Sequence, residues 1–362
     1  MTTTDSSELL FLSQEDAIEA GATDMERCVE AMIDVFDLYD QDRVAIGQYL
    51  HGQMITFPAG LADVEASSLR PGSRFGAMPA YVGGDVSMAG IKWYGSVTAW
   101  PDETAAPRSP PLLTLTDPDT GKPLVMMNGA IISTMRTGAM AGVGAKYLQG
   151  DRAEVASIIG PGRVGQAASL GLDATLDSLE ELYITHPDES KAEAFAEKMA
   201  PSLTVDVTPT DSIEEAVSSA DVTVTAASRD PAPRIEPSWL PDDSTVIQLG
   251  DLNVPLDAFD DDRLFCDIRE HPLQFDEQVG WEITGEFTAA VEDGLSLSSI
   301  RTLYELVGGT DTGPTEGKSL LSSLGLPMED VTWGTIVYRN AVDADLGQTL
   351  TLASYSPFDK PY

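Results

Sequence analysis

Residues 154–168 read EVASIIGPGRVGQAA, an apolar run that ends in three glycines, Gly160, Gly162 and Gly165. At this spacing the first glycine permits a tight turn out of a strand, and the second lets a pyrophosphate approach the backbone. The third lets the following helix pack closely on the sheet, with its N-terminal end facing the phosphates. The stretch therefore predicts a dinucleotide site in the middle of the chain.

The residues after this turn alternate between short apolar strands and helices. The expected elements, in order, are strand 182–185, helix 190–199, strand 205–207, helix 212–219, strand 221–226 and strand 244–249. This alternation is typical of βαβ units, which build a parallel sheet with helices on both faces and ligands at the carboxyl ends of the strands. The predicted fold class is α/β, with a Rossmann dinucleotide-binding domain.

The residues before the turn have a different pattern. Residues 15–39 have the spacing of one or more amphipathic helices, and short strands divided by Gly, Pro and Asp follow them. The expected strands are 53–57, 74–81, 89–95 and 111–116, and residues 117–121 have the composition of a turn. We expect these elements to form a mixed α+β first domain.

The chain is strongly acidic, with 59 Asp and Glu residues against 21 Lys and Arg and a net charge of −38. The acids are scattered over almost every segment, so the charge belongs to the whole surface and not to one binding patch. Molar salt shortens the Debye length to roughly 3 Å and makes such repulsion tolerable. We therefore expect a salt-rich cytoplasm, and we expect neither nucleic acid nor a membrane as a partner, because both repel this surface.

Other compositional features narrow the class further. No apolar run reaches membrane-spanning length, and the polar, acidic N-terminus lacks the basic and apolar regions of a signal peptide, so we expect a soluble cytoplasmic protein. Cys28 and Cys266 lie far apart in an expected helix and strand, which favours packed thiols over a bridge or a nucleophile. None of the three histidines is spaced as one of a ligand pair, so we expect no metal site.

Two basic residues are candidates for substrate binding. Lys92 lies in the apolar stretch 88–95, where its pKa can fall and its ammonium can polarise a carbonyl or imine; alternatively, its stem lies along the strand and its ammonium reaches solvent. Arg136 lies among small residues in the expected helix 131–146, capped by Ser133 or Thr134. Its guanidinium suits bidentate capture of a carboxylate, with a surface salt bridge as the alternative.

Asp251 is an acidic candidate. It directly follows the apolar stretch 246–250, so it emerges where the strand ends and the ligand crevice is expected. A loop-capping aspartate is the alternative interpretation.

In this order, the segments resemble the ornithine cyclodeaminase and μ-crystallin family over residues 10–352. Besides the glycine turn, the most specific stretches are 77–81, 90–92, 119–123, 133–138, 248–251, 285–286, 303–306 and 325–330. The resemblance implies that a dinucleotide domain at 146–310 is inserted into a substrate and dimerisation domain made of residues 1–145 and 311–362. It also implies a homodimer.

The resemblance further implies hydride exchange between a nicotinamide and the Cα of an amino acid or imine. Carried over residue by residue, it makes Lys92 the group that polarises the substrate carboxylate or a bound water, Arg136 the carboxylate clamp and Asp251 the acid/base partner of the reacting nitrogen. Hydride leaves Cα only when the amine is deprotonated and an anion lies near the developing iminium, which agrees with these roles.

The sequence departs from the family at a second carboxylate-binding arginine, because the corresponding strand, residues 52–57, contains none. Arg74 is the expected substitute, with Arg70 as a weaker candidate. The amino-acid sequence of residues 78–84 and 91–95 is also closer to that of the branch containing N-(2-amino-2-carboxyethyl)-L-glutamate synthase than to that of the cyclodeaminase. Substrate identity therefore stays open.

The cofactor choice depends on the end of the second expected strand, where an acid holds the ribose of NAD and an arginine favours the 2′-phosphate of NADP. Here His186 takes the place of the acid, and Asp188 follows two residues later. Since this loop contains no arginine and Lys191 is the nearby cation, we predict NAD without excluding NADP. Of the remaining positions, Thr137, Arg163 and Val164 are also expected to contact the cofactor.

The leading functional hypothesis is an NAD(P)-dependent amino acid or imine oxidoreductase, in the form of ornithine cyclodeaminase, a lyase that converts ornithine to proline and ammonia. Alanine dehydrogenase, ketimine reductase and an enzyme acting on an N-substituted amino acid are alternatives of the same chemistry. An alternative of another class is a μ-crystallin-like protein that holds NADP(H) and a small ligand without turnover.

Overall fold

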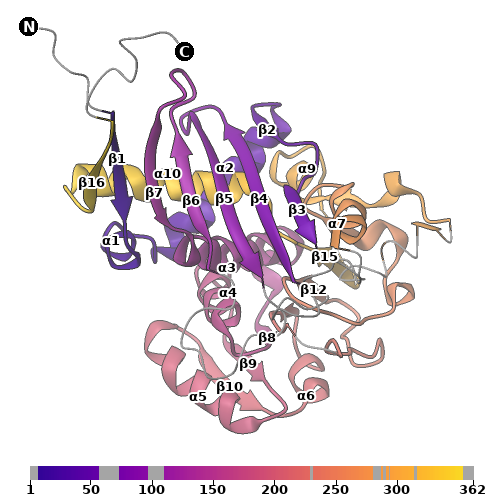
Figure 1. The fold of residues 1–362 in the computed structure, drawn as a ribbon. Coiled ribbons are helices and arrows are strands. Elements are labelled where there is room, and N and C mark those ends of the chain that lie inside the picture. The colour runs from indigo at the N-terminus through magenta and orange to yellow at the C-terminus, as the bar shows by residue number, and fades with distance from the viewer. Residues whose placement is uncertain are drawn as a thin grey trace, which may run out of the picture.

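The computed structural model describes residues 7–56, 73–96, 110–228, 231–279, 287, 291–292, 294–313 and 316–353. These residues form two β-sheets, one above the other in Figure 1, with helices packed on both. Of the sequence-based candidates, Arg70 and the stretch 285–286 lie outside the described residues. In the part of the chain that is described, no helix has the length and apolarity needed to cross a membrane.

The first sheet has the order β16-β1-β7-β6-β5-β4-β2, with β3 paired to β4. Its strands are β1 (Ser7–Leu12), β2 (Val44–Ile46), β3 (Gln53–Thr56), β4 (Arg74–Val82), β5 (Met88–Ser96), β6 (Leu112–Thr116), β7 (Pro123–Asn128) and β16 (Gln348–Ala353). β1 and β7 are parallel, and the other pairs are antiparallel. Because β16 comes from the other end of the chain and pairs with β1, both ends contribute to this sheet.

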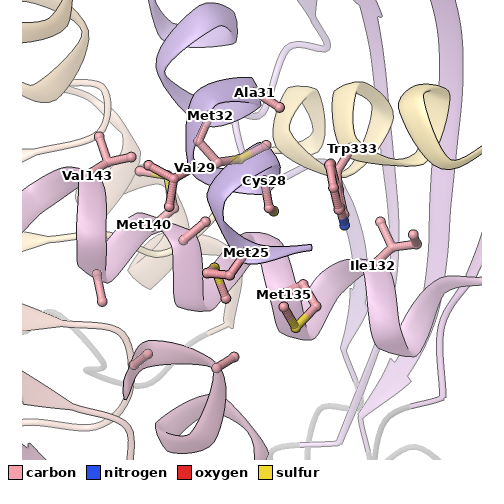
Figure 2. Close-up of a cluster of buried hydrophobic side chains, with 14 of the residues drawn as sticks. Met25, Cys28, Val29, Ala31, Met32, Ile132, Met135, Met140, Val143 and Trp333 are labelled. Carbon is pink, nitrogen blue, oxygen red and sulfur yellow. The ribbon is translucent and has the colours of Figure 1, made fainter. Parts of the chain in front are cut away.

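Helices cover one face of the first sheet, as Figure 1 shows. They are α1 (Gln14–Glu19), α2 (Met25–Asp40) and α10 (Pro327–Asp343), and α10 packs against β4, β5 and β6. Figure 2 shows part of the core between α2, α10 and α3 (Gly129–Leu148), where Met32, Met140 and Trp333 are buried. The one or more helices expected over residues 15–39 are two, α1 and α2, separated by a turn that contains Gly21 in the left-handed region (φ 91°).

The second sheet is parallel throughout and has the order β10-β9-β8-β11-β12-β15-β13-β14. Its strands are β8 (Val155–Ile159), β9 (Glu181–Thr185), β10 (Asp206–Thr210), β11 (Val222–Thr225), β12 (Thr245–Gln248), β13 (Leu264–Cys266), β14 (Arg301–Thr302) and β15 (Ser319–Ser322). Chain order reverses between β8 and β11, which is the switch point where doubly wound sheets bind ligands. The predicted fold class, including the glycine turn that follows a strand, is confirmed.

The helices of this domain are α4 (Arg163–Asp173), α5 (Glu189–Met199), α6 (Ile213–Val217), α7 (His271–Val279) and α9 (Leu303–Val307). β15 lies beyond residue 310, where the sequence-based division placed the return to the first domain, yet it pairs with β12 and β13. We therefore move our proposed boundary to the loop after Ser322, which leads directly into α10.

α3 connects the two sheets, and its small residues allow a close approach to α4. A Cβ atom on Gly138 would lie 2.3 Å from the carbonyl carbon of Ala167, and one on Gly142 would lie 2.3 Å from the Gly171 oxygen. The expected cap of this helix was wrong. β7 runs straight into the helix at Asn128, whose side chain accepts the Ala130 N–H at 2.9 Å, so Ser133 and Thr134 lie inside the helix.

Candidate active site

A cavity of about 520 Å³ opens at the switch point of the parallel sheet. The ends of three strands and the glycine turn line it, through Gly160 and Gly162 after β8, His186 after β9, and Ala226 and Ala227 after β11. Parallel strands that end at one edge around a helix N-terminus form the usual setting for a bound pyrophosphate. The sequence-predicted turn therefore lines a cavity at the position that a dinucleotide needs.

The three glycines of the turn have distinct surroundings. Gly160 has φ 115°, which favours glycine, and a Cβ on Gly165 would lie 2.1 Å from the Gly160 oxygen. A Cβ on Gly162 would meet nothing within 4 Å, so the protein itself leaves this space open. Gly162 caps α4 without a side-chain hydrogen bond, and the first N–H groups of the helix can therefore bind an anion. These features fit a dinucleotide phosphate.

The edge of this cavity beyond β9 carries two lysines and a histidine. His186, Lys191 and Lys198 line it, and the Lys198 Nζ donates to Gln166 Oε1 at 2.7 Å. Asp188 is not among the described lining residues; its carboxylate accepts the Ser190 hydroxyl at 2.6 Å, which lowers its pKa. The structure thus brings His186 to the cavity and does not bring Asp188 there.

A second cavity, of about 200 Å³, adjoins the other side of the glycine turn. Its described lining comes from the first sheet, α3 and the start of α4: His51, Arg74, Met78, Lys92, Tyr94, Pro111, Ala130, Ser133, Thr134, Arg136, Thr137, Arg163 and Val164. The structure therefore brings together Lys92, Arg136 and Arg74, the three predicted substrate-binding residues. The predicted cofactor residues Thr137, Arg163 and Val164 line this cavity as well.

Buried acids hold two of these cations. The Lys92 Nζ lies 2.6 Å from Asp330 Oδ2, and the Arg136 Nη1 lies 2.8 Å from Glu329 Oε2. Both acids belong to the first turn of α10, where the helix dipole favours negative charge. Ser133 Oγ accepts from both Lys92 and Arg136 at 3.3 Å. Neither alternative proposed for these cations, a solvated lysine head or a surface salt bridge, is what the structure shows.

Burial and charge shift the pKa values within this network. Burial lowers the pKa of Lys92 to about 8, although Asp330 opposes the change. Burial also raises the pKa of Glu329 to about 8, with Arg136 acting against it. For Asp330, burial favours the neutral acid, but Arg136 and Lys92 together outweigh it and lower the pKa. The network therefore contains a lysine that is able to release its proton near neutral pH.

Asp251 follows β12, and its backbone N–H donates to the Ala227 oxygen at 2.8 Å. It is not among the described residues that line either cavity, although Ala227 lines the first. The cavity geometry therefore supports Lys92 and Arg136 more directly than it supports Asp251.

Three further residues were missed as candidates from the sequence. Glu329 and Asp330 lie in the stretch 325–330 that carried part of the resemblance, but acids at the start of a helix are common and did not indicate ion pairs. His51 lines the second cavity and had no signal in its spacing. In the described residues, no group of three or more His, Cys, Asp or Glu side chains is arranged to hold a metal ion.

Comparisons with known proteins agree with this architecture. The chain is 24% identical to N-((2S)-2-amino-2-carboxyethyl)-L-glutamate dehydrogenase of Staphylococcus aureus over 95% of its own length and 99% of that protein. It resembles the solved Δ(1)-pyrroline-2-carboxylate reductase of Thermococcus litoralis with NADH and L-proline, with a TM-score of 0.78, 21% identity and coverage of 94% and 99% of the two chains. An archaeal alanine dehydrogenase dimer with bound NAD gives a TM-score of 0.77, 22% identity and coverage of 96% and 100%.

These solved structures share the fold and hold NADH or NAD, which confirms the expectation of a nicotinamide dinucleotide for proteins of this fold. The model of the ornithine cyclodeaminase/mu-crystallin family matches residues 22–345. The resemblance drawn from the sequence is therefore confirmed: this chain belongs to the ornithine cyclodeaminase/mu-crystallin family.

Proposed function

We propose that this protein is an NAD(P)-dependent oxidoreductase that exchanges a hydride with the Cα of an α-amino acid or its imine. The observation that carries the proposal is that consecutive residues of the glycine turn line the two cavities. Gly162 lines the dinucleotide cavity, and the next two residues, Arg163 and Val164, line the cavity that contains Lys92 and Arg136. The turn that would hold a dinucleotide therefore also forms part of the cavity that contains the buried cations.

In this proposal, the side chains of the smaller cavity bind and orient the substrate. Arg136, Lys92 and Arg74 attract its carboxylate, and the acids behind Arg136 and Lys92 fix the direction of both cations. When bound, the dinucleotide supplies a nicotinamide that accepts the hydride from Cα. The substrate nitrogen must lose a proton to form the imine, and we assign this proton to Asp251, at the end of β12.

The charge of the lining favours an anionic substrate. Arg74, Lys92, Arg136 and Arg163 are cations, and no Asp or Glu is among the described residues that line the cavity. Ornithine would place a second ammonium in this cavity without an acidic partner. We therefore propose dehydrogenase or reductase chemistry first, on alanine, a cyclic imine or an N-substituted amino acid with several carboxylates. Ornithine cyclodeamination stays as the second candidate because of the family.

NAD remains the proposed cofactor, and the edge beyond β9 predicts that NADP is accepted as well. Lys191 and Lys198 line that edge and offer positive charge to a 2′-phosphate, while Asp188, the expected partner of the ribose hydroxyls, is not among the described lining residues. A lysine binds phosphate as a point charge, without the geometric selectivity of arginine. We expect affinities for NADH and NADPH that differ by less than about tenfold, or 1.4 kcal/mol.

We also propose a homodimer formed through the face of the first sheet opposite α10, which is the face towards the viewer in Figure 1. Strand alternation exposes Ile91 (37%) and Trp93 (44%) on this face while Lys92 and Tyr94 are buried. Ile55 (54%) and Leu112 (44%) extend the same surface. In so acidic a chain, an uncharged sheet face is best explained by a second copy with the same face.

Dimerisation is tested by light scattering in multimolar KCl. We expect a dimer for the native chain and a monomer for Trp93→Glu, with Ile18→Glu, at an exposed residue of α1, as the matched control that stays dimeric. A native monomer, or a dimer that survives Trp93→Glu, would contradict the proposed interface.

The activity is tested by following NAD(P)H absorbance in multimolar KCl with alanine, proline, ornithine, pyrroline-2-carboxylate, and pyruvate with ammonia. A dehydrogenase or reductase changes the NAD(P)H absorbance, whereas a cyclodeaminase releases proline and ammonia from ornithine without net NADH. Full activity after Lys92→Ala would contradict the proposed site. Tight nucleotide binding without turnover of any compound would instead favour a μ-crystallin-like binding protein.

A further inference from the structure

His51 belongs to the substrate cavity but has no part in the mechanism above. It lies between β2 and β3, and its ring is enclosed by side chains from other elements. Phe275 of α7 meets the ring edge-on at 4.6 Å, and the His271 ring stacks on it at 5.6 Å with an angle of 24°. These contacts fix the orientation of the imidazole.

One ring nitrogen of His51 is committed to the protein. Its Nδ1 lies 2.9 Å from the Gly325 carbonyl oxygen, which only accepts, so Nδ1 carries the proton and donates it. The carbonyl is itself held in place, because Asp267 Oδ2 accepts the Leu324 N–H at 3.0 Å and the Gly325 N–H at 3.4 Å. The loop after β15 thus selects one tautomer of His51.

The second ring nitrogen of His51 is left as an acceptor. Burial lowers the pKa of His51 well below its usual value, and the charged groups that face it, His271, Lys92, Arg74 and Arg136, act in the same direction. The ring is therefore neutral, with a lone pair on Nε2. Among the described residues, Nε2 has no hydrogen-bond partner.

The other polar groups of the described lining are cations and the hydroxyls of Tyr94, Ser133, Thr134 and Thr137, of which the Tyr94 hydroxyl has no hydrogen-bond partner in the described residues. A hydroxyl can donate as well as accept, whereas the unprotonated ring nitrogen of His51 can only accept. Ser133 Oγ already accepts from Lys92 and Arg136, and the Thr137 hydroxyl donates to the backbone carbonyl oxygen of Ser133 at 2.7 Å. A substrate carboxylate finds donors throughout this lining. An N–H of the substrate needs an acceptor, and repulsion by the cations favours binding of that nitrogen as an uncharged amine or imine.

We propose that His51 Nε2 accepts a hydrogen bond from the reacting nitrogen of the substrate and so makes the cavity selective for nitrogen-bearing carboxylates. The assignment rests on the proposed function for the identity of the reacting atom, but it is a statement about binding. A site built around such a bond discriminates strongly against an analogue that lacks the donor, because the acceptor is then left unpaired.

The test compares two probes of similar shape, L-proline and cyclopentanecarboxylate, which differ in the ring nitrogen. Their affinities are measured by calorimetry with the NADH-loaded protein in multimolar KCl. We expect the native protein to bind L-proline at least about tenfold more tightly, which is about 1.4 kcal/mol. Equal affinities, or binding of neither probe, would overturn the proposal.

Two substitutions distinguish the structural role of His51 Nδ1 from the proposed acceptor role of Nε2. In His51→Asn, the amide N–H can replace Nδ1 towards Gly325, but no acceptor replaces Nε2, so the preference for L-proline falls to about twofold or less. Cyclopentanecarboxylate makes no hydrogen bond to Nε2, so its affinity changes less than that of L-proline, while the loss of ring contacts with Phe275 and His271 lowers the unfolding temperature in both variants of His51. His51→Gln places an amide oxygen near Nε2 and keeps most of the preference. A preference that survives His51→Asn but is lost in Asp251→Asn would assign the acceptor to Asp251 instead.

A measurement without substitution uses the small number of histidines in the chain, which is three. With ¹⁵N-labelled imidazoles, we expect an unprotonated Nε2 in His51, with a resonance that shifts on addition of L-proline but not of cyclopentanecarboxylate. A protonated Nε2, or an equal response to both probes, would overturn the assignment. If no compound is turned over but the His51-dependent preference is present, the proposed oxidoreductase activity fails and the assignment of His51 stands.

Discussion

The two cavities on either side of the glycine turn are built in opposite ways. The dinucleotide cavity includes one short stretch, the glycine turn from Gly160 to Gly165, whose backbone leaves space for a phosphate, and residues after β9 and β11 and in α5 complete its lining. The substrate cavity joins segments far apart in sequence: Lys92 and Asp330 are separated by 238 positions and lie 2.6 Å apart. The dinucleotide cavity depends on local backbone geometry. The substrate cavity depends on buried ion pairs that form only when the protein folds.

The largest effect should come from breaking the charge network. Arg136→Met leaves Glu329 and Asp330 buried without the guanidinium that contacts both, and we expect a loss of about 3–5 kcal/mol in the free energy of unfolding, along with activity. The matched control is Arg27→Met, because Arg27 pairs with Glu30 on an exposed helix face, where the loss should be below about 1 kcal/mol. Denaturant unfolding in multimolar KCl measures the free energy of unfolding of both variants. Similar losses would mean that the buried network stabilises the protein no more than an exposed ion pair does.

The next effect concerns the dependence of stability on pH. The pKa of Glu329 is raised to about 8 in the folded protein, so the folded state binds more protons than the unfolded state between about pH 4.5 and 8. The protonated Glu329 therefore contributes fully to the free energy of unfolding at the acid end of this window, and this contribution is lost as pH rises through it. Glu329→Gln should remove a fall of a few kcal/mol between pH 5 and 8. Parallel stability curves for the native chain and the variant would show that Glu329 does not titrate in this range.

The contrast between a contiguous turn and a cavity built from distant segments also explains how much of this site the sequence predicts. The glycine turn, its strand and the parallel sheet were predictable because their signals are contiguous. Lys92 and Arg136 stood out because cations are unusual among apolar and small residues. Their acidic partners, Glu329 and Asp330, were not predicted because they resemble ordinary acids at the start of a helix. Only tertiary packing brings them next to Lys92 and Arg136.

Local ambiguity explains other differences. The cap of α3 was misplaced because Ser133 and Thr134 are good capping residues, whereas the chain begins the helix at Asn128, as soon as β7 ends. The division at residue 310 came before β15 because a four-residue strand is a weak signal. His51 was missed because its role depends on the distant Gly325 and His271, with which it has no sequence relation.

A pair of glycine substitutions tests the dinucleotide cavity separately. Gly162→Ala adds a methyl group to space that the protein leaves open, so stability without nucleotide should stay close to native while NADH affinity falls about 10–100-fold. Gly165→Ala collides with the Gly160 oxygen and should lower both stability and affinity. Thermal unfolding and NADH fluorescence titration distinguish the two. Undiminished NADH binding by Gly162→Ala would place the phosphates elsewhere.

The smallest effect concerns the choice of cofactor. Removing Lys191, at the edge beyond β9, should weaken NADPH binding a few-fold and NADH binding less than about twofold, because a single exposed charge contributes less than about 1 kcal/mol. Lys122→Ala, in an exposed turn outside both cavities, is the control and should change neither. Equal losses for the two nucleotides in Lys191→Ala would mean that this edge does not read the 2′-phosphate.

The central claim is that the nicotinamide meets the substrate beside Lys92 and Arg136, and isotope transfer tests it most directly. The protein is incubated with NAD and Cα-deuterated alanine, ornithine or proline in multimolar KCl, and deuterium at C4 of the NADH is measured by mass spectrometry. We predict transfer from at least one amino acid by the native chain, and at least about a 100-fold loss in Lys92→Ala with NADH affinity unchanged. Absence of transfer in the native chain, or undiminished transfer in Lys92→Ala, would contradict the account.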